Sequence, residues 1–210
     1  MMQFCKQKFK TYFLIAAAAF YAFYLIGYDV GQYARFLSLG MEGIPFLRYF
    51  INTALITFCS LAAPVSVLLS FCFAKKSGKW KNLLLPVGFG LKAITAFSLA
   101  FSSSRLLTAE SLLGVIYYLL LLVQGISVVA MFIGTLNKGA FAPLLKWSAL
   151  THVAAAVLLE VAYLAYLLPR VGFGHFFLNS STHSLSVILA NLFYFALFLT
   201  IAPAKKANFK

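Results

Sequence analysis

Charged residues are scarce in this chain of 210 residues: they make up 10% of it, and only four residues are carboxylates. Hydrophobic residues account for 63% of the sequence, and the mean hydropathy is +0.94. A soluble domain with so much apolar surface would aggregate. The composition therefore excludes an ordinary soluble protein and predicts an all-α integral membrane protein.

Catalytic and metal-binding motifs are also absent from the sequence. The three cysteines, Cys5, Cys59 and Cys72, share no metal-type spacing, so we expect small apolar side chains rather than ligands. His175 and His183 lie eight residues apart with no Cys, Asp or Glu close by, which favours solvated loop residues over a metal site. With no Walker motif and no Ser/His/Asp set, we expect no catalytic residues, no metal and no cofactor, and an enzyme is the least supported class.

Long apolar runs dominate what is present. They cover about residues 11–28, 49–73, 83–102, 112–136, 144–168 and 185–204. Each is long enough to cross a bilayer as a helix, and the polar segments between them are short. No small-residue cleavage site follows the first run, which favours an uncleaved helix over a signal peptide. The pattern predicts one domain, residues 1–210, that forms a bundle of six transmembrane helices. Between the first two runs, the sequence predicts a short interfacial helix over residues 32–39.

The basic residues predict the orientation of this domain. Twelve of the 13 lysines fall in the two tails or at the connections after the second and fourth runs, if Lys146 at the start of the fifth run is included. The four arginines and three of the acids fall in the other connections. By the positive-inside rule both termini are cytoplasmic, most simply in the cell membrane. The lysine-rich face should attract anionic lipids. A net charge of +13 placed at the ends of apolar segments does not indicate a nucleic-acid partner.

Two charged residues lie deep inside the apolar runs. Glu160 is the only such acid, and Lys92 is the only lysine away from the basic side. Lys92 follows Trp80 by 12 residues and Glu160 follows Trp147 by 13, and both tryptophans suit the headgroup level. At 1.5 Å per residue each charge lies roughly 18–20 Å above its tryptophan. Charges in hydrocarbon are costly alone, so we predict that Lys92 and Glu160 meet near the midplane.

Helical spacing predicts which residues share the inward face with this pair. On the fifth run one stripe contains Ala149, His152, Ala156, Glu160, Tyr163 and Leu167. On the third run Gly88 and Ala96 flank Lys92 and allow close helix approach. Gln124 and Asn191 lie near the centres of the fourth and sixth runs. The predicted substrate- or ion-binding residues are Lys92, Glu160, His152, Tyr163, Gln124 and Asn191.

Two interpretations of these polar residues compete. In the first, they form a site near the membrane midplane in a transporter or a membrane-embedded solute-binding subunit. In the second, they only hold the helices together in a non-transporting accessory or assembly protein. Without any shared motif, the architecture resembles the substrate-binding membrane subunits of vitamin transporters that use a separate ATPase. That resemblance implies a partner membrane protein or ATPase, because this chain has no ATPase motif of its own.

Overall fold

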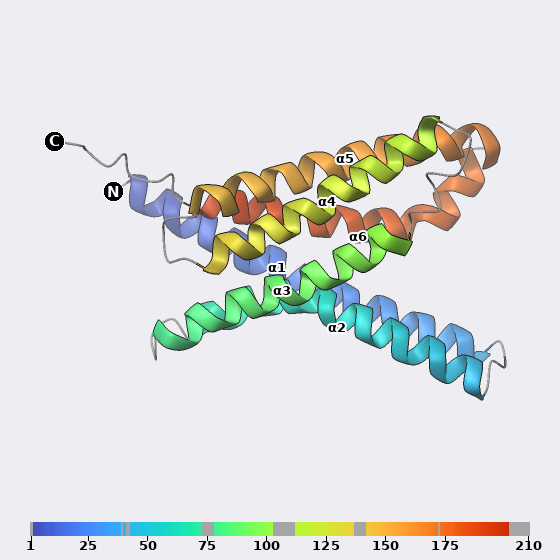
Figure 1. Ribbon diagram of the computed structural model, residues 1–210, viewed down its shortest axis with the longest axis horizontal. Helices are drawn as coiled ribbons and strands as arrows, with labels where there is room; N and C mark the ends of the chain where they lie inside the picture. The colour runs from blue at the N-terminus through green and yellow to red at the C-terminus, as the bar shows by residue number, and fades with distance from the viewer. Residues whose placement is uncertain are drawn as a thin grey trace.

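The computed structural model describes residues 2–38, 40, 43–72, 78–102, 112–136, 142–171 and 173–201, and over these ranges it consists of six α-helices (Figure 1). The helices are α1 (Met2–Ser38), α2 (Ile44–Cys72), α3 (Gly78–Ser102), α4 (Leu112–Leu136), α5 (Ala142–Val171) and α6 (Phe173–Thr200). The all-helical fold predicted from the apolar runs is therefore confirmed.

Four of the helices contain segments long and apolar enough to cross a membrane. These segments are Lys8–Tyr28, Ala54–Cys72, Gly114–Leu136 and Pro143–Ala162. Within the described residues, α3 and α6 contain shorter apolar segments, Leu83–Phe97 and Val187–Thr200. The length and composition of the helices are thus those of a membrane protein.

Glycines define the turn between α1 and α2. Gly40, with a φ of 68°, follows the end of α1, and its N–H donates to the Leu37 carbonyl at 3.1 Å. A left-handed residue at this position is the common way to end a helix, and glycine adopts it without a steric penalty. Gly43 has a φ of 77°, and its carbonyl accepts the first α2 hydrogen bond, from Leu47 N–H at 3.0 Å.

The helices are arranged as a closed ring. Each helix packs mainly against its neighbours in sequence, and α6 packs against α1 to complete the circle (Figure 1). The hydroxyl of Thr200 donates to the Lys10 carbonyl at 3.3 Å, which joins the end of α6 to the beginning of α1. The two termini therefore lie at the same end of the bundle, which we call the terminal end. At the opposite end, the pair α1–α2 diverges from α4 and α5 (Figure 1).

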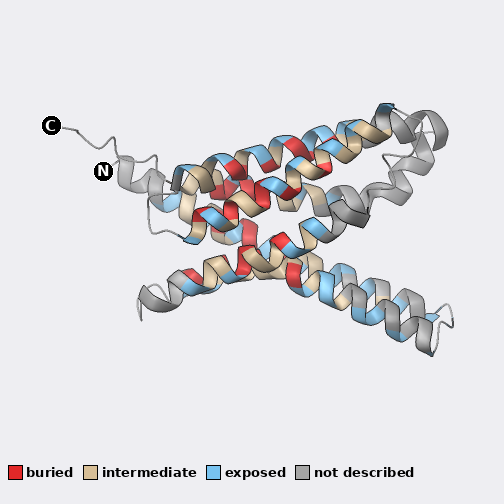
Figure 2. Ribbon diagram, in the orientation of Figure 1, coloured by how far each residue is buried: buried red, intermediate tan, exposed pale blue. Residues whose placement is uncertain are grey.

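Buried side chains gather in the half of the ring nearer the terminal end (Figure 2). Phe89, Met131, Phe193 and Ala149 are completely buried there. Small residues bring the helices close: a Cβ added at Gly88 would collide with the Ser66 side chain of α2. This close approach explains why α2 and α3 pack tightly despite a proline in each.

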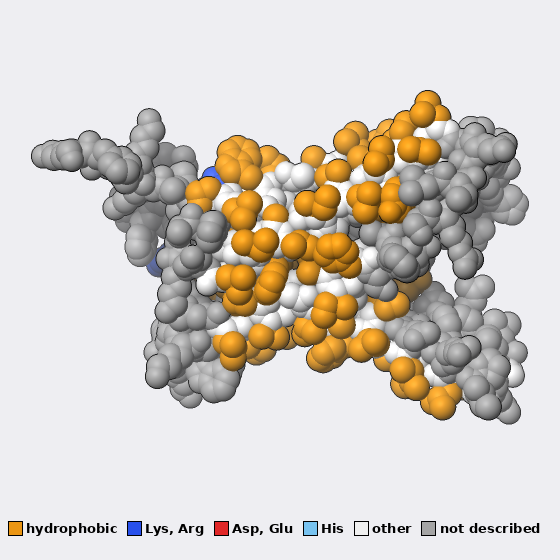
Figure 3. Space-filling model, viewed as in Figure 1, with side chains coloured by type: hydrophobic (Ala, Val, Ile, Leu, Met, Phe, Trp, Pro, Cys, Tyr) orange, Lys and Arg blue, Asp and Glu red, His pale blue; other side chains and the backbone are white. Residues whose placement is uncertain are grey.

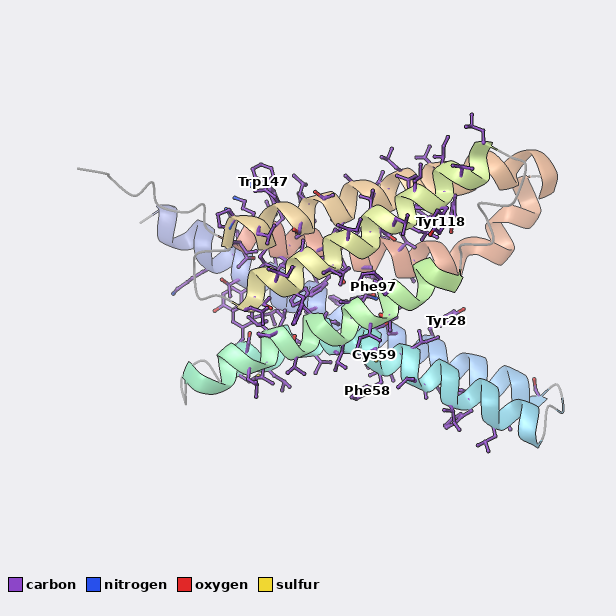
Figure 4. The ribbon with its side chains drawn as sticks, viewed as in Figure 1. Tyr28, Phe58, Cys59, Phe97, Tyr118 and Trp147 are labelled. Carbon is purple, nitrogen blue, oxygen red and sulfur yellow. The ribbon has the colours of Figure 1, made fainter. Side chains whose placement is uncertain are left out.

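The outer surface of the described residues is apolar. Figure 3 shows hydrophobic side chains spread across the coloured middle of the visible face, with lysine near the terminal end. On α2, Phe58 is 62% exposed on this outer side, while its neighbour Cys59 is buried (Figure 4). Trp147, also exposed, lies on α5 near the terminal end and its ring packs 6.1 Å from that of Phe198 (Figure 4). An apolar belt with an aromatic ring at its edge is the surface that lipid requires.

Two predictions about the connections are wrong. Residues 32–38 are not a separate interfacial helix, because α1 continues to Ser38 without a break. Residues 173–184 are not a loop, because α6 already begins at Phe173. Both segments are more polar than the runs they extend, and hydropathy reports where a helix meets lipid rather than where its backbone hydrogen bonds end. The side chains of His175 and His183 lie outside the described residues.

Candidate solute-binding cavity

A cavity of about 390 Å³ lies inside the ring, and all six helices contribute to its wall. Five of the six predicted site residues line it: Lys92, Gln124, His152, Glu160 and Asn191. The side chain of the sixth, Tyr163, lies outside the described residues. The structure thus brings together side chains from α3, α4, α5 and α6 that the sequence separates by up to 99 positions, from Lys92 to Asn191.

The predicted inward stripe of α5 explains this placement. Ala149, His152 and Ala156 are all buried, and Glu160 continues the same face into the cavity wall. Residues on the other side of α5, such as Val157 and Val161, are at least half exposed. Three- and four-residue spacing keeps one helix face toward the ring centre, so the polar members must meet the interior.

Lys92 provides the positive charge of the cavity. Its Nζ donates to the Ser60 hydroxyl of α2 at 3.4 Å, and the Lys92 carbonyl accepts from the Thr95 hydroxyl at 2.8 Å. Ser60 and Thr95 also line the cavity. The ammonium group has three N–H donors, so a contact with Ser60 leaves it able to bind an anionic group of a solute.

Glu160 provides the negative charge and is partly buried in the wall on α5. In the ring, α4 stands between α3 and α5, so Lys92 and Glu160 approach the cavity from separate walls. Both charges line the same cavity, and their equal depth in a membrane stays a prediction. Their direct contact stays a prediction, since the hydrogen bond described for Lys92 is the one to Ser60.

His152 is held by two contacts. Its Nδ1 lies 3.0 Å from the Ser127 hydroxyl of α4, which itself donates to the Gln124 carbonyl at 2.6 Å. The Ser127 hydroxyl thus lies within hydrogen-bond distance of both the Gln124 carbonyl and the His152 Nδ1, and it links α4 to α5. The ring also packs against Tyr194, with centroids 4.2 Å apart. His152 is therefore fixed in orientation.

Asn191 and Tyr194 present polar atoms that the described residues leave without a partner. The Asn191 Oδ1 and the Tyr194 hydroxyl are both buried and have no hydrogen bond with any residue that the structure describes. The two residues lie three positions apart on α6, hence on one face, and both line the cavity. Tyr194 as a whole is only 1% exposed. Buried polar atoms normally find a partner, so these two suit an occupant of the cavity.

The comparisons with known proteins identify no relative. No protein-family model, no curated protein and no solved structure matches the chain. Among the described residues no group of three or more His, Cys, Asp or Glu side chains could hold a metal ion. Any inference about function therefore depends on the geometry of the cavity.

The cavity is closed toward the terminal end. On α2 it is lined by Ile56 and Ser60, whereas the packed core begins one turn closer to the terminal end, at Ala63. The other helices show the same offset. On α4, for example, the cavity wall reaches from Tyr117 to Val128, and the core continues to Met131. A packed layer therefore separates the cavity from the terminal end, while the helices diverge at the other end (Figure 1).

Tyr194 is the functional candidate that sequence reasoning missed. Tyrosine is common in apolar helices and carries no charge, so composition did not single it out. Its spacing of three from Asn191 is the signal that was available, because it places both on one face of α6. Ser127 was missed for the same reason, although it lies three residues after Gln124.

Proposed function

We propose that this chain is a small membrane transporter or a membrane-embedded solute-binding subunit, with its site in the cavity around Lys92 and Glu160. The observation that carries the proposal is the cavity of about 390 Å³ that holds both charges at the middle of the helices. Its volume falls in the range of small-molecule sites, which is about 300–1,000 Å³. Ionisable residues within membrane segments mark substrate or ion pathways, and transporters bind their solutes near the midplane.

In this proposal all six helices cross the cell membrane and both termini are cytoplasmic. Under the positive-inside rule, the lysine-rich terminal end faces the cytoplasm and contacts anionic lipids. The packed layer then separates the site from the cytoplasm, and the divergent end faces outward. Transport requires this layer to open, driven by an ion gradient or by a partner protein such as an ATPase. A solute-binding subunit would present the bound molecule to such a partner.

A second candidate function is a non-transporting accessory or assembly protein. The hydrogen bond between Ser127 and His152 favours it, because this bond joins α4 to α5 without any solute. Several hydroxyls also bond within their own helix, such as Ser66 to the Ala63 carbonyl at 2.8 Å and Ser70 to the Val67 carbonyl at 2.7 Å. Such residues stabilise a helix bundle without binding a ligand.

A variant series with purified protein separates the two functions. The test measures the thermal unfolding midpoint, Tm, with and without the small-molecule fraction of a host-cell extract. For a binding site, the fraction raises the Tm of the wild type but not that of Glu160→Gln or of Ala156→Phe, which fills the cavity. Ala154→Phe is the matched control, because Ala154 lies on the exposed face of the same helix.

A purely structural role for Lys92 and Glu160 predicts a different pattern of Tm values. If they only hold the bundle, the single variants Lys92→Met and Glu160→Gln both lower Tm, and the exchange Lys92→Glu with Glu160→Lys restores part of the loss. A folded Glu160→Gln protein that responds to the extract as the wild type does contradicts the proposed site.

A further inference from the structure

The polar groups of the cavity are arranged by sign. Lys92, with Ser60, stands on the wall formed by α2 and α3. Glu160 and the Asn191 Oδ1 stand on the wall formed by α5 and α6. In the order of the ring, α3 is opposite α6 and α2 is opposite α5. One wall therefore offers a cation, and the facing wall offers an anion and a neutral acceptor.

Two buried polar atoms without a hydrogen bond among the described residues indicate which groups the wall formed by α5 and α6 can bind. The Asn191 Oδ1 accepts hydrogen bonds only, and it is buried without one from any described residue. The Tyr194 hydroxyl beside it can donate or accept. A carboxylate has about four lone-pair sites, so Glu160 can accept from a solute in addition to its contacts within the protein. This wall therefore suits a group rich in N–H donors, and an ammonium group also neutralises its charge.

The charge balance restricts the solute further. The charges of Lys92 and Glu160, both of which line the cavity, sum to zero, so a solute with a net charge leaves the site with an unbalanced charge in a medium of low dielectric constant. An uncharged polyol offers no charge to either wall. A solute with a positive and a negative end matches both walls at once.

We infer that the solute is a small zwitterion. Its ammonium group binds between Glu160, the Asn191 Oδ1 and the Tyr194 hydroxyl, and its carboxylate binds the Lys92 ammonium. Amino-carboxylic acids are the chemical class with this pair of groups in a molecule that a cavity of about 390 Å³ can hold. The inference rests on the proposed function, because it requires the cavity to bind a solute.

The test uses two series of commercially available probes, each matched in its carbon skeleton. One is leucine with 4-methylpentan-2-amine and 4-methylpentanoate, and the other is 4-aminobutyrate with butylamine and butyrate. The second series places the two charged groups farther apart than the first. Erythritol serves as the uncharged polar probe. Affinity is measured by Tm shift and by titration calorimetry on the full-length protein in detergent.

We expect a zwitterion from at least one series to bind, and to raise Tm by about 5–11 °C at 100 times its Kd. Its matched amine and acid should bind at least about tenfold more weakly, since each loses one charge contact. Lys92→Met should remove the preference for the zwitterion over the amine, and Glu160→Gln the preference over the acid. Lys146→Met, on the side of α5 that faces Phe198, is the charge-removal control and should leave all affinities unchanged.

The other outcomes separate this inference from the proposed function. If erythritol, an amine or an acid binds as tightly as the zwitterion and Ala156→Phe abolishes that binding, the cavity is a solute site and the zwitterion inference is wrong. If no probe binds but the cell extract still raises Tm in a manner that depends on Ala156, the inference is again wrong and the function stands. If neither probes nor extract raise Tm, both are wrong.

Discussion

Removal of the Tyr194 hydroxyl should not lower the free energy of unfolding of the solute-free protein. The Tyr194 ring packs against Phe193 with centroids 5.0 Å apart and against His152 at 4.2 Å, and phenylalanine keeps these contacts. The hydroxyl is buried with no partner among the described residues, and an unsatisfied buried polar group costs about 1–3 kcal/mol. Tyr194→Phe should therefore leave the free energy of unfolding unchanged or raise it by about 1 kcal/mol.

The same substitution should weaken solute binding. A lost hydrogen bond to a charged group is worth about 1.5–3 kcal/mol, which corresponds to roughly 10- to 150-fold in Kd. Stability is measured by reversible unfolding in mixed detergent, and Kd by titration with the tightest-binding probe. Tyr12→Phe is the matched control, because the Tyr12 side chain is 68% exposed, and it should change neither quantity. If Tyr194→Phe lowers the free energy of unfolding by more than about 1 kcal/mol, the hydroxyl has a partner in the empty protein and the reasoning fails.

Three further predictions concern packing and orientation. Gly88→Ala should lower the free energy of unfolding by about 1–3 kcal/mol because the added Cβ meets the Ser66 side chain, whereas the control Gly27→Ala, with open space around it, should be neutral or stabilising. Equal effects of the two variants in unfolding assays would contradict the close approach of α2 and α3. Ser127→Ala should cost about 0.6–1.7 kcal/mol by removing the hydroxyl between α4 and α5, and an unchanged unfolding midpoint would show that this bond contributes nothing. Cys72 is exposed at the end of α2, so a variant with Cys72 as its single cysteine tests the orientation. A membrane-impermeant thiol reagent should label this variant in inside-out vesicles but not in intact cells. Labelling of intact cells would reverse the proposed orientation.

The sequence was informative about which face of a helix turns inward. The stripe from Ala149 to Glu160 follows from helical period alone, and the structure buries its first three polar or small members and places Glu160 in the cavity wall. The shared depth of Lys92 and Glu160 also follows from counting residues along two helices. Both predictions needed no knowledge of which helices are neighbours.

Other features depend on contacts between helices and could not be read from local pattern. The packing of α6 against α1, and the layer of Phe89, Met131 and Phe193 that closes one end of the cavity, arise from residues far apart in the chain. The pairing of His152 with Ser127 depends on the rotation of α4 relative to α5, which no spacing within one helix determines. Helix ends were also misjudged, because polar residues continue α1 and α6 beyond their apolar parts.

The ring has a consequence for the order in which the protein assembles. Among the described residues, every principal helix contact except that between α1 and α6 joins neighbours in sequence, so these contacts can form in the order in which the helices are synthesised. The wall is completed only when α6 reaches α1 and brings Asn191 and Tyr194 into place. Without α6 packed against α1, the cavity lacks the part of its wall that carries Asn191 and Tyr194. The complete set of cavity groups is therefore a property of the closed ring and not of any pair of neighbouring helices.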